Sequence, residues 1–164
     1  TASVNTITPA CTAGTGAITL DVADGTPPYN FIWTGPTAIG NVEDPTGLDA
    51  GTYSVIVRDA NYTTPGLCDV TLSNIVVPGP PAIFNVLGTG SICSGSPGIA
   101  ISLDGSELGV NYTLFRGVTS IETIAGTGSA FGFSAQIAAG TYTVQAQSTL
   151  TSCTNIMNGS ATIT

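Results

Sequence analysis

The chain has 164 residues with ten Asp or Glu, two Arg and no Lys or His, so its formal net charge is −8. Two cations cannot neutralise a run of phosphates, which excludes nucleic acid as a partner. Without His or Lys, the chain lacks the usual general bases and Schiff-base lysines, so we expect no enzyme activity. Its apolar stretches are all shorter than the roughly 18 residues of a membrane-spanning helix, so we expect no membrane insertion.

Alternating apolar and polar residues predict short β-strands through the first half of the chain. The apolar residues expected to share a strand face are Ile18, Leu20 and Val22, then Tyr29, Phe31 and Trp33, then Tyr53, Val55 and Val57. Turn-forming Gly and Pro residues separate these runs at residues 25–28, 35–36 and 44–47. Helical periodicity is nearly absent, which predicts an all-β fold.

The sequence Pro-Gly-Pro-Pro at residues 78–81 marks a boundary between two domains, predicted at 1–78 and 79–164. The second half repeats the strand pattern of the first. Its inward-facing residues are expected to be Ile99, Ile101 and Leu103, then Tyr112 and Leu114, then Tyr142, Val144 and Ala146. Turns every 8 to 12 residues or so predict two tandem immunoglobulin-like β-sandwiches of about seven strands each.

One motif occurs in both halves, as Ala-Gly-Thr-Tyr-Ser-Val at residues 50–55 and Ala-Gly-Thr-Tyr-Thr-Val at 139–144. An apolar residue, Leu48 or Ile137, stands five positions before each tyrosine. This spacing predicts a tyrosine corner, in which the hydroxyl of Tyr53 or Tyr142 bonds a backbone group a few residues upstream. The alternative is that the two tyrosines are exposed binding residues.

Each copy of the motif lies between two cysteines of its own half. Cys11 and Cys68 are 57 positions apart, and Cys93 and Cys153 are 60 apart. The even number and matched spacing predict two disulfides, Cys11–Cys68 and Cys93–Cys153, and therefore an oxidising compartment outside the cytoplasm. Each loop closure would stabilise a small domain by about 4 kcal/mol. Free buried thiols are the alternative.

The first half resembles the SprB-repeat family over about residues 9–76. The motifs that carry the resemblance are, in order, Cys11, Gly-Ala-Ile-Thr-Leu at 16–20, Asp-Gly-Thr-Pro-Pro-Tyr at 24–29, Trp33, Leu-Asp-Ala-Gly-Thr-Tyr-Ser-Val at 48–55, Asp-Ala-Asn at 59–61, and Cys68. Residues 62–67 are an insertion relative to that pattern. The second half is similar only in its cysteines, residues 112–116 and the corner at 139–142.

The SprB-repeat resemblance implies a tandem repeat segment of a very large adhesin of gliding Bacteroidetes, exported by type IX secretion. The segment would lie outside the cell, at the outer-membrane surface, and serve attachment and gliding motility. Its partners would be neighbouring repeats and a surface polysaccharide or an abiotic surface. The alternative function is a carbohydrate-binding module of a larger secreted protein.

Three kinds of site are compatible with the remaining residues. Asp59 and Asn61 have a spacing that suits calcium, which Asp21, Asp24 or Asp69 could approach at a loop end; no other cofactor is expected. Trp33 is the candidate stacking residue for a carbohydrate, although its strand face predicts core packing. Ile32, Ile56, Tyr62 and Phe115 could form an exposed patch. The acid pairs Glu43/Asp44 and Asp104/Glu107 are the only candidates for glycoside hydrolysis, and both lie in turn-rich segments.

Overall fold

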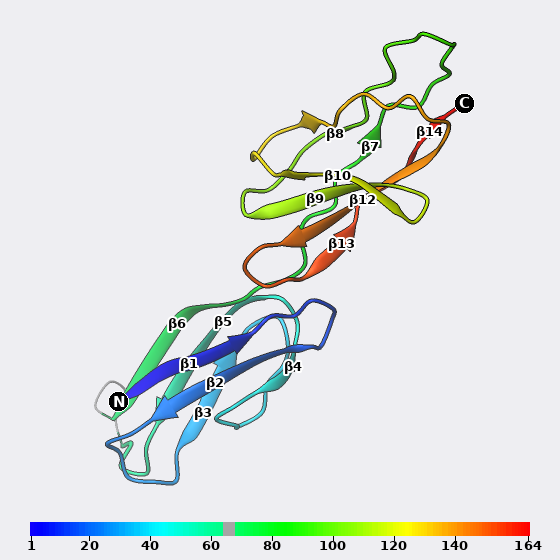
Figure 1. Ribbon diagram of the computed structural model, residues 1–164. Helices are drawn as coiled ribbons and strands as arrows, with labels where there is room; N and C mark the ends of the chain where they lie inside the picture. The colour runs from blue at the N-terminus through cyan, green and yellow to red at the C-terminus, as the bar shows by residue number, and fades with distance from the viewer. Residues whose placement is uncertain (64–67) are drawn as a thin grey trace. The chain divides into compact units, whose positions relative to one another are not determined.

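The computed structural model describes residues 1–63 and 68–164, and all the regular elements in these ranges are β-strands. No helix of the described residues is long and apolar enough to cross a membrane. The chain divides into two compact units, Thr1–Gly79 and Pro80–Thr164. The boundary therefore lies one residue beyond the predicted one. Figure 1 shows strands packed in layers within each unit. Residues 64–67, which belong to the insertion at 62–67, lie outside the described residues.

Unit 1 is built from two antiparallel sheets of three strands. Its strands are β1 (Ala2–Thr8), β2 (Gly16–Val22), β3 (Asn30–Thr34), β4 (Thr46–Leu48), β5 (Gly51–Arg58) and β6 (Asp69–Val77). One sheet has the order β1-β2-β4 and the other β3-β5-β6. The described part of unit 1 thus has six strands where about seven were predicted.

The core of unit 1 lies between its two sheets. Ile18 and Leu20 of β2 belong to one buried cluster with Phe31 of β3 and with Tyr53 and Val55 of β5. The predicted alternation of inward and outward residues is confirmed here, since β2 and β5 bury every second side chain. Three predicted core residues near the edges of the cluster are only partly buried: Val22, Tyr29 and Trp33.

Unit 2 has the same two-layer plan with more strands. They are β7 (Val86–Leu87), β8 (Ser102–Leu103), β9 (Val110–Arg116), β10 (Thr119–Ala125), β11 (Phe131–Gly132), β12 (Gly140–Ser148), β13 (Thr154–Ile156) and β14 (Ala161–Ile163). The larger sheet runs β10-β9-β12-β13, with β14 also paired to β12, and the smaller runs β11-β8-β7. The hairpin β9–β10 has no counterpart in the described part of unit 1.

Aromatic rings form a continuous series in the core of unit 2. The rings of Phe84 and Tyr112, Tyr112 and Phe131, and Phe131 and Phe133 meet edge to face, with centroids 6.4, 5.5 and 5.2 Å apart. Tyr112 is fully buried, and this burial raises the pKa of its hydroxyl. Its oxygen accepts a hydrogen bond from the Glu107 amide at 3.0 Å, so the buried polar atom has a partner.

Candidate functional site

The repeated motif forms the same hydrogen bond in both units. Tyr53 is 1% exposed, and its hydroxyl donates to the Asp49 carbonyl at 2.9 Å. Tyr142 is fully buried, and its hydroxyl donates to the Ala138 carbonyl at 2.7 Å. In each case the acceptor lies four residues upstream, which is the contact that a tyrosine corner requires. The two tyrosines are thus structural residues and not exposed binding residues.

A glycine begins the corner strand in each unit. Gly51 has φ 150° and Gly140 has φ 148°, a backbone region that side chains disfavour. The upstream apolar residues differ, because Leu48 is fully buried whereas Ile137 is 69% exposed. The glycine and the tyrosine are therefore the parts of the motif with the same structural role in both copies.

The cysteines do not form the predicted pairs. Cys68 and Cys93 are free thiols, whereas Cys11 and Cys153 are disulfide-bonded. The predictions Cys11–Cys68 and Cys93–Cys153 are therefore wrong. In unit 1, β6 separates the two cysteines: Cys68 precedes its first residue, and Ala10, beside Cys11, donates to the carbonyl of Pro78 just after its last. Nine residues of strand span about 30 Å, far more than the roughly 7 Å at which two Cα atoms can be bridged.

Carboxylates of both units accept hydrogen bonds from backbone amides of other segments. Asp44 accepts from the Leu20 amide at 2.9 Å, and Glu107 accepts from the Ala82 amide at 2.7 Å. Asp104 accepts from both the side chain and the backbone of Asn85, at 2.6 and 2.8 Å, and these bonds lower the pKa of its carboxyl. The acids considered for glycoside hydrolysis thus include three that hold loops to strands.

The residues considered for calcium bind a neighbouring loop. Asp59 accepts from the amides of Thr26 and Asn61, at 3.2 and 3.0 Å, and the Asn61 side chain donates to the Thr26 hydroxyl at 2.8 Å. Among the residues described, no group of three or more His, Cys, Asp or Glu is arranged to hold a metal ion. The observed role of Asp59 and Asn61 is to fix the connection between β2 and β3.

Trp33 packs partly against the core of unit 1, and its indole N–H donates to the Val42 carbonyl at 2.8 Å. Of the residues considered for an exposed patch, two are paired in the structure and one belongs to the other unit. Ile32 and Ile56 are cross-strand neighbours on the outer face of the β3-β5-β6 sheet. The Arg58 guanidinium lies 4.2 Å from the centre of the Tyr62 ring, and Phe115 belongs to unit 2.

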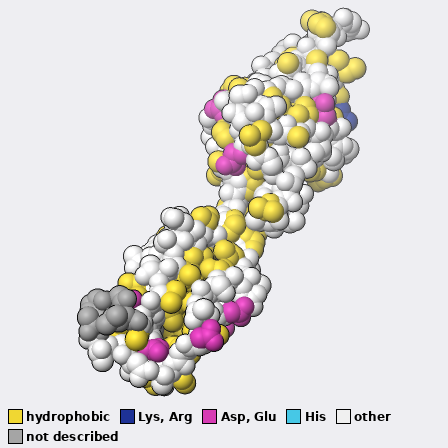
Figure 2. Space-filling model, turned by 90° about the vertical axis from the view of Figure 1, so that its left-hand side faces the viewer, with side chains coloured by type: hydrophobic (Ala, Val, Ile, Leu, Met, Phe, Trp, Pro, Cys, Tyr) yellow, Lys and Arg dark blue, Asp and Glu magenta, His cyan; other side chains and the backbone are white. Residues whose placement is uncertain are grey.

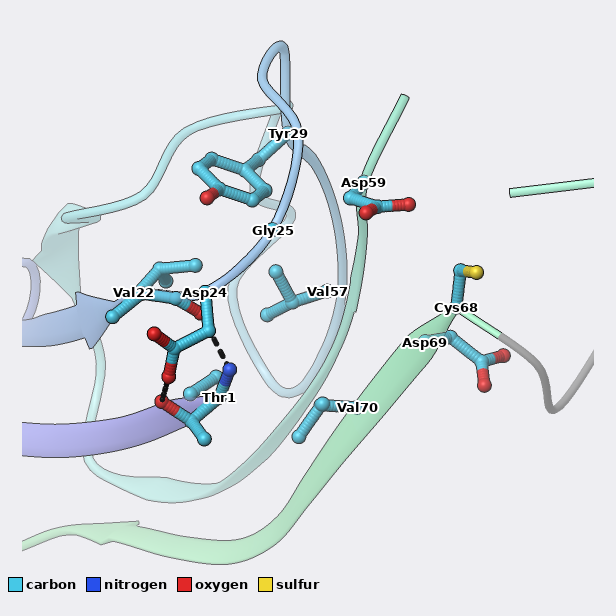
Figure 3. Close-up of a pocket in the computed structure, with 12 residues that line it drawn as sticks. Thr1, Val22, Asp24, Gly25, Tyr29, Val57, Asp59, Cys68, Asp69 and Val70 are labelled. Carbon is cyan, nitrogen blue, oxygen red and sulfur yellow. Dashed lines mark hydrogen bonds between the residues drawn. The ribbon is translucent and has the colours of Figure 1, made fainter. Parts of the chain in front are cut away.

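A cavity of about 250 Å³ opens at the end of unit 1 where the β2–β3 and β5–β6 connections meet (Figure 3). Val22, Val57 and Tyr29 contribute apolar wall, while Asp24, Asp59 and Asp69 contribute carboxylates. Asp24 also accepts a hydrogen bond from the Thr1 hydroxyl at 3.3 Å. Asp21 is not among the lining residues and bonds the Asn5 side chain instead. Asp24 and Asp69 thus line the same cavity as Asp59, but the described acids do not form a group that could hold a metal ion.

Sequence reasoning named Val22, Tyr29 and Val57 as strand-face residues but did not place them at a cavity. A hydrophobic stripe runs along unit 1 over the neighbouring edge strands β1 and β6 (Figure 2). On these two strands Ile7 and Val70 face inward, because Ile7 pairs with buried Ile18 and Val70 pairs with buried Val57, yet they are 37% and 38% exposed. An assignment of β1 and β6 as edge strands could have predicted this exposure, because inward side chains are incompletely covered at a sheet edge.

Comparison with known proteins adds a structural likeness alone. No protein-family model matches the chain, and a search of curated proteins found no match. Among solved structures, the human OSCAR ligand-binding domain is similar, with a TM-score of 0.47 and 11% identity over 98% of this chain and 94% of that one. The resemblance to SprB repeats therefore rests on the sequence motifs.

Proposed function

We propose that this chain is a repeat segment, made of two immunoglobulin-like β-sandwich domains, of a large secreted adhesin that attaches cells to surfaces. The observation that carries the proposal is the tyrosine corner, which has the same backbone bond and the same glycine conformation in both units. What the two copies share therefore maintains their fold. A repeat that serves as a spacer and attachment segment needs a stable fold in each copy and no shared catalytic group.

The surface composition supports a place outside the cell. Charged residues make up 7% of the chain, so hydroxyl and amide groups supply most of its polarity. The motifs of the first half favour, by their resemblance, the gliding adhesins of Bacteroidetes, with type IX secretion and a position on the outer-membrane surface. The partners we propose are neighbouring repeats and a polysaccharide or abiotic surface, without enzymatic activity.

A carbohydrate-binding module is the less favoured alternative. A carbohydrate-binding site of this kind needs an aromatic side chain with an open face, against which a sugar ring can stack. The Trp33 ring is instead partly packed on the core with its N–H bonded to Val42, and the Arg58 guanidinium lies over the Tyr62 ring. The Trp33 and Tyr62 side chains are thus both engaged within unit 1.

Adhesion can be measured with beads that carry the chain in one orientation. Because the chain has no lysine, amine coupling attaches it through the Thr1 amine. We expect such beads to resist flow on glass or polysaccharide better than beads carrying an immunoglobulin domain of similar size and charge. Equal detachment would contradict the adhesive function.

A glycan array distinguishes the carbohydrate-binding module from the adhesive repeat. Specific binding to one glycan that Trp33→Phe removes, while the unfolding free energy stays unchanged, would favour the carbohydrate-binding module. Phe is chosen because it keeps an aromatic ring against the core and removes only the indole.

A further inference from the structure

The sequence Asn-Gly occurs once in the chain, at residues 158–159 in unit 2. Asparagine can lose its side-chain amide when the backbone nitrogen of the next residue attacks it. Glycine at that next position favours the reaction, because it has no Cβ to obstruct the attack and its backbone is the most adaptable. Asn158 is therefore a candidate site of chemical modification that the proposed function does not use.

The surroundings of Gly159 leave its backbone nitrogen open to react. Asn158 and Gly159 are both exposed, and Gly159 has φ 76° with nothing within 4 Å of the position that a Cβ would occupy. Among the residues that the structure describes, none accepts a hydrogen bond from the Gly159 amide. The attacking nitrogen is thus neither covered by packing nor held by a partner.

The side chain of Asn158 is held by one neighbour. Its Nδ2 donates to Oδ1 of Asn85 at 2.7 Å, and Nδ2 of Asn85 donates to Oδ2 of Asp104 at 2.6 Å. We call these three side chains the amide chain. The attack requires the Asn158 side chain to turn back over its own peptide group and away from Asn85. The bond to Asn85 should therefore slow the reaction.

We propose that Asn158 is a site of spontaneous deamidation and that Asn85 limits its rate. The Gly159 nitrogen loses its proton and attacks Cγ of Asn158. A C–N bond forms, and the bond between Cγ and Nδ2 breaks as ammonia leaves. Water then opens the resulting succinimide ring at either carbonyl, which gives aspartate or isoaspartate. The net reaction consumes one water and releases one ammonia, with no oxidation or reduction.

The aspartate product would disrupt the amide chain. The Nδ2 of Asn85 already donates to the Asp104 carboxylate. A carboxylate at position 158 would face Oδ1 of Asn85, which is also an acceptor, so no proton would lie between the two oxygens. Turning the Asn85 amide over would only move the same conflict to Asp104. The modification therefore removes the side-chain bond between two segments of unit 2.

The isoaspartate product would have the larger effect, because it adds one carbon atom to the backbone after Asn158. The Asn158 amide donates to the Phe84 carbonyl at 2.8 Å, and the Asn158 carbonyl accepts from the Val86 amide at 2.9 Å. The strand β14 follows, with Ile163 buried in the core. A longer connection shifts these bonds relative to β14, so the Val86 amide should exchange its hydrogen faster in the modified chain.

Peptide mapping by mass spectrometry of the folded chain, kept in mildly alkaline buffer, tests the site. Asn155 is the internal comparison, because its Nδ2 also donates one bond, to the Pro81 carbonyl at 2.9 Å, but β-branched Ile156 follows it. We expect Asn158 to react at least about tenfold faster than Asn155. Equal rates at the two residues, or an Asn158 that reacts only in urea-unfolded chain, would overturn the proposal.

Asn85→Ala tests the role of Asn85. The variant removes the acceptor of the Asn158 side chain, while the backbone amide of residue 85 keeps its bond to Asp104. We expect deamidation at Asn158 to accelerate by roughly threefold to tenfold. An unchanged rate would overturn the assignment of Asn85.

Glu122→Ala is the matched control for Asn85→Ala. It also removes an exposed side-chain contact of unit 2, with the Ser134 amide at 2.8 Å, outside the amide chain. Its deamidation rate should stay at that of the unmodified chain. Equal acceleration by both variants would show that a general loosening of unit 2 sets the rate, and would also overturn the assignment. The inference goes beyond the proposed function, since bead adhesion can fail or succeed independently of this reaction.

Discussion

The two units differ most at the outer edge of their third strand. In unit 2, β9 lies between β12 and a seven-residue partner, β10, which satisfies its backbone. In the described part of unit 1, β3 pairs with β5 alone, and a side chain and a loop carbonyl bond residues of β3 instead. The Asn41 side chain accepts from the Phe31 amide at 2.7 Å, and the Val42 carbonyl accepts from the Trp33 indole.

This difference shows that a backbone amide of an outer strand can be satisfied either by another strand or by a well-placed amide side chain. An uncovered edge would offer free backbone groups to other chains. The new outer edge in unit 2 is itself interrupted by a bulge between Ser120 and Glu122. Each of the following substitutions should lower the stability of one unit and leave the stability of the other unchanged.

The largest effect is expected where the loop that covers β3 touches the corner tyrosine. A Cβ on Gly35 would lie 2.1 Å from a ring carbon of Tyr53, and the buried ring cannot move away. Gly35→Ala should therefore destabilise unit 1 by roughly 1–3 kcal/mol. Trp33 is the one tryptophan of the chain, so its fluorescence during urea unfolding reports on unit 1.

Gly40→Ala is the matched control for Gly35→Ala, because Gly40 is in the same loop and a Cβ there meets nothing within 4 Å. We expect its unfolding free energy to stay within about 0.5 kcal/mol of the unmodified chain. Equal effects of the two substitutions would show that the loop does not press on the corner.

The second prediction removes the side chain that closes the β3 edge. Asn41→Ala leaves the part-buried Phe31 amide without its acceptor, which should cost unit 1 roughly 1–2 kcal/mol. The expected result is a lower urea midpoint by Trp33 fluorescence, with amide signals of unit 2 unchanged by NMR. An unchanged midpoint would mean that water serves the edge as well as Asn41 does.

The corner tyrosines allow the two units to be compared directly. Tyr53→Phe removes the bond to Asp49 and a contact of 3.0 Å with the Thr37 hydroxyl, whereas Tyr142→Phe removes the bond to Ala138. Each should cost about 1 kcal/mol in its own unit, with the larger loss for Tyr53→Phe. Amide hydrogen exchange, measured separately in each unit, gives the two losses of stability. A larger loss for Tyr142→Phe than for Tyr53→Phe would contradict the prediction.

The smallest effect concerns acid stability. The pKa of Asp104 is lowered in the folded state by its Asn85 bonds, so its contribution is complete above its ordinary value of 3.8 and lost as the pH falls through the folded value. Asp104→Asn should lower the Tm of unit 2 at pH 7, and the difference should shrink in acid. Glu43→Gln, an exposed acid in unit 1, is the control. A difference that stays constant with pH would remove the ionic explanation.

Strand faces and the corner could be read from the sequence because both depend on local spacing. Every second residue of a strand meets the core, so Val55, Val57, Val144 and Ala146 were identifiable by alternation. The β9–β10 hairpin was harder, because Ile121 is 38% exposed and Ile124 only partly buried, which leaves β10 with little apolar alternation.

The cysteine pairing failed for a topological reason. The spacing of two cysteines along the chain does not show at which end of a domain each one lies. That depends on how many times the chain reverses direction between the two connections that carry them. The β1–β2 and β5–β6 connections fall at opposite ends of unit 1, so Cys11 and Cys68 are separated. The same topology places Asp24, Asp59 and Asp69 at one end of unit 1. Predicting this from the sequence would require the complete order of the strands.

The positions of the two arginines affect how well the folded chain resists proteases that cut after basic residues. Arg58 ends β5 and Arg116 ends β9, each hydrogen-bonded between two neighbouring strands and only partly exposed. A protease that cuts after basic residues needs several residues in an extended, unpaired conformation, which the paired strands provide only when they open. Folded copies should therefore persist in fluids rich in trypsin-like enzymes.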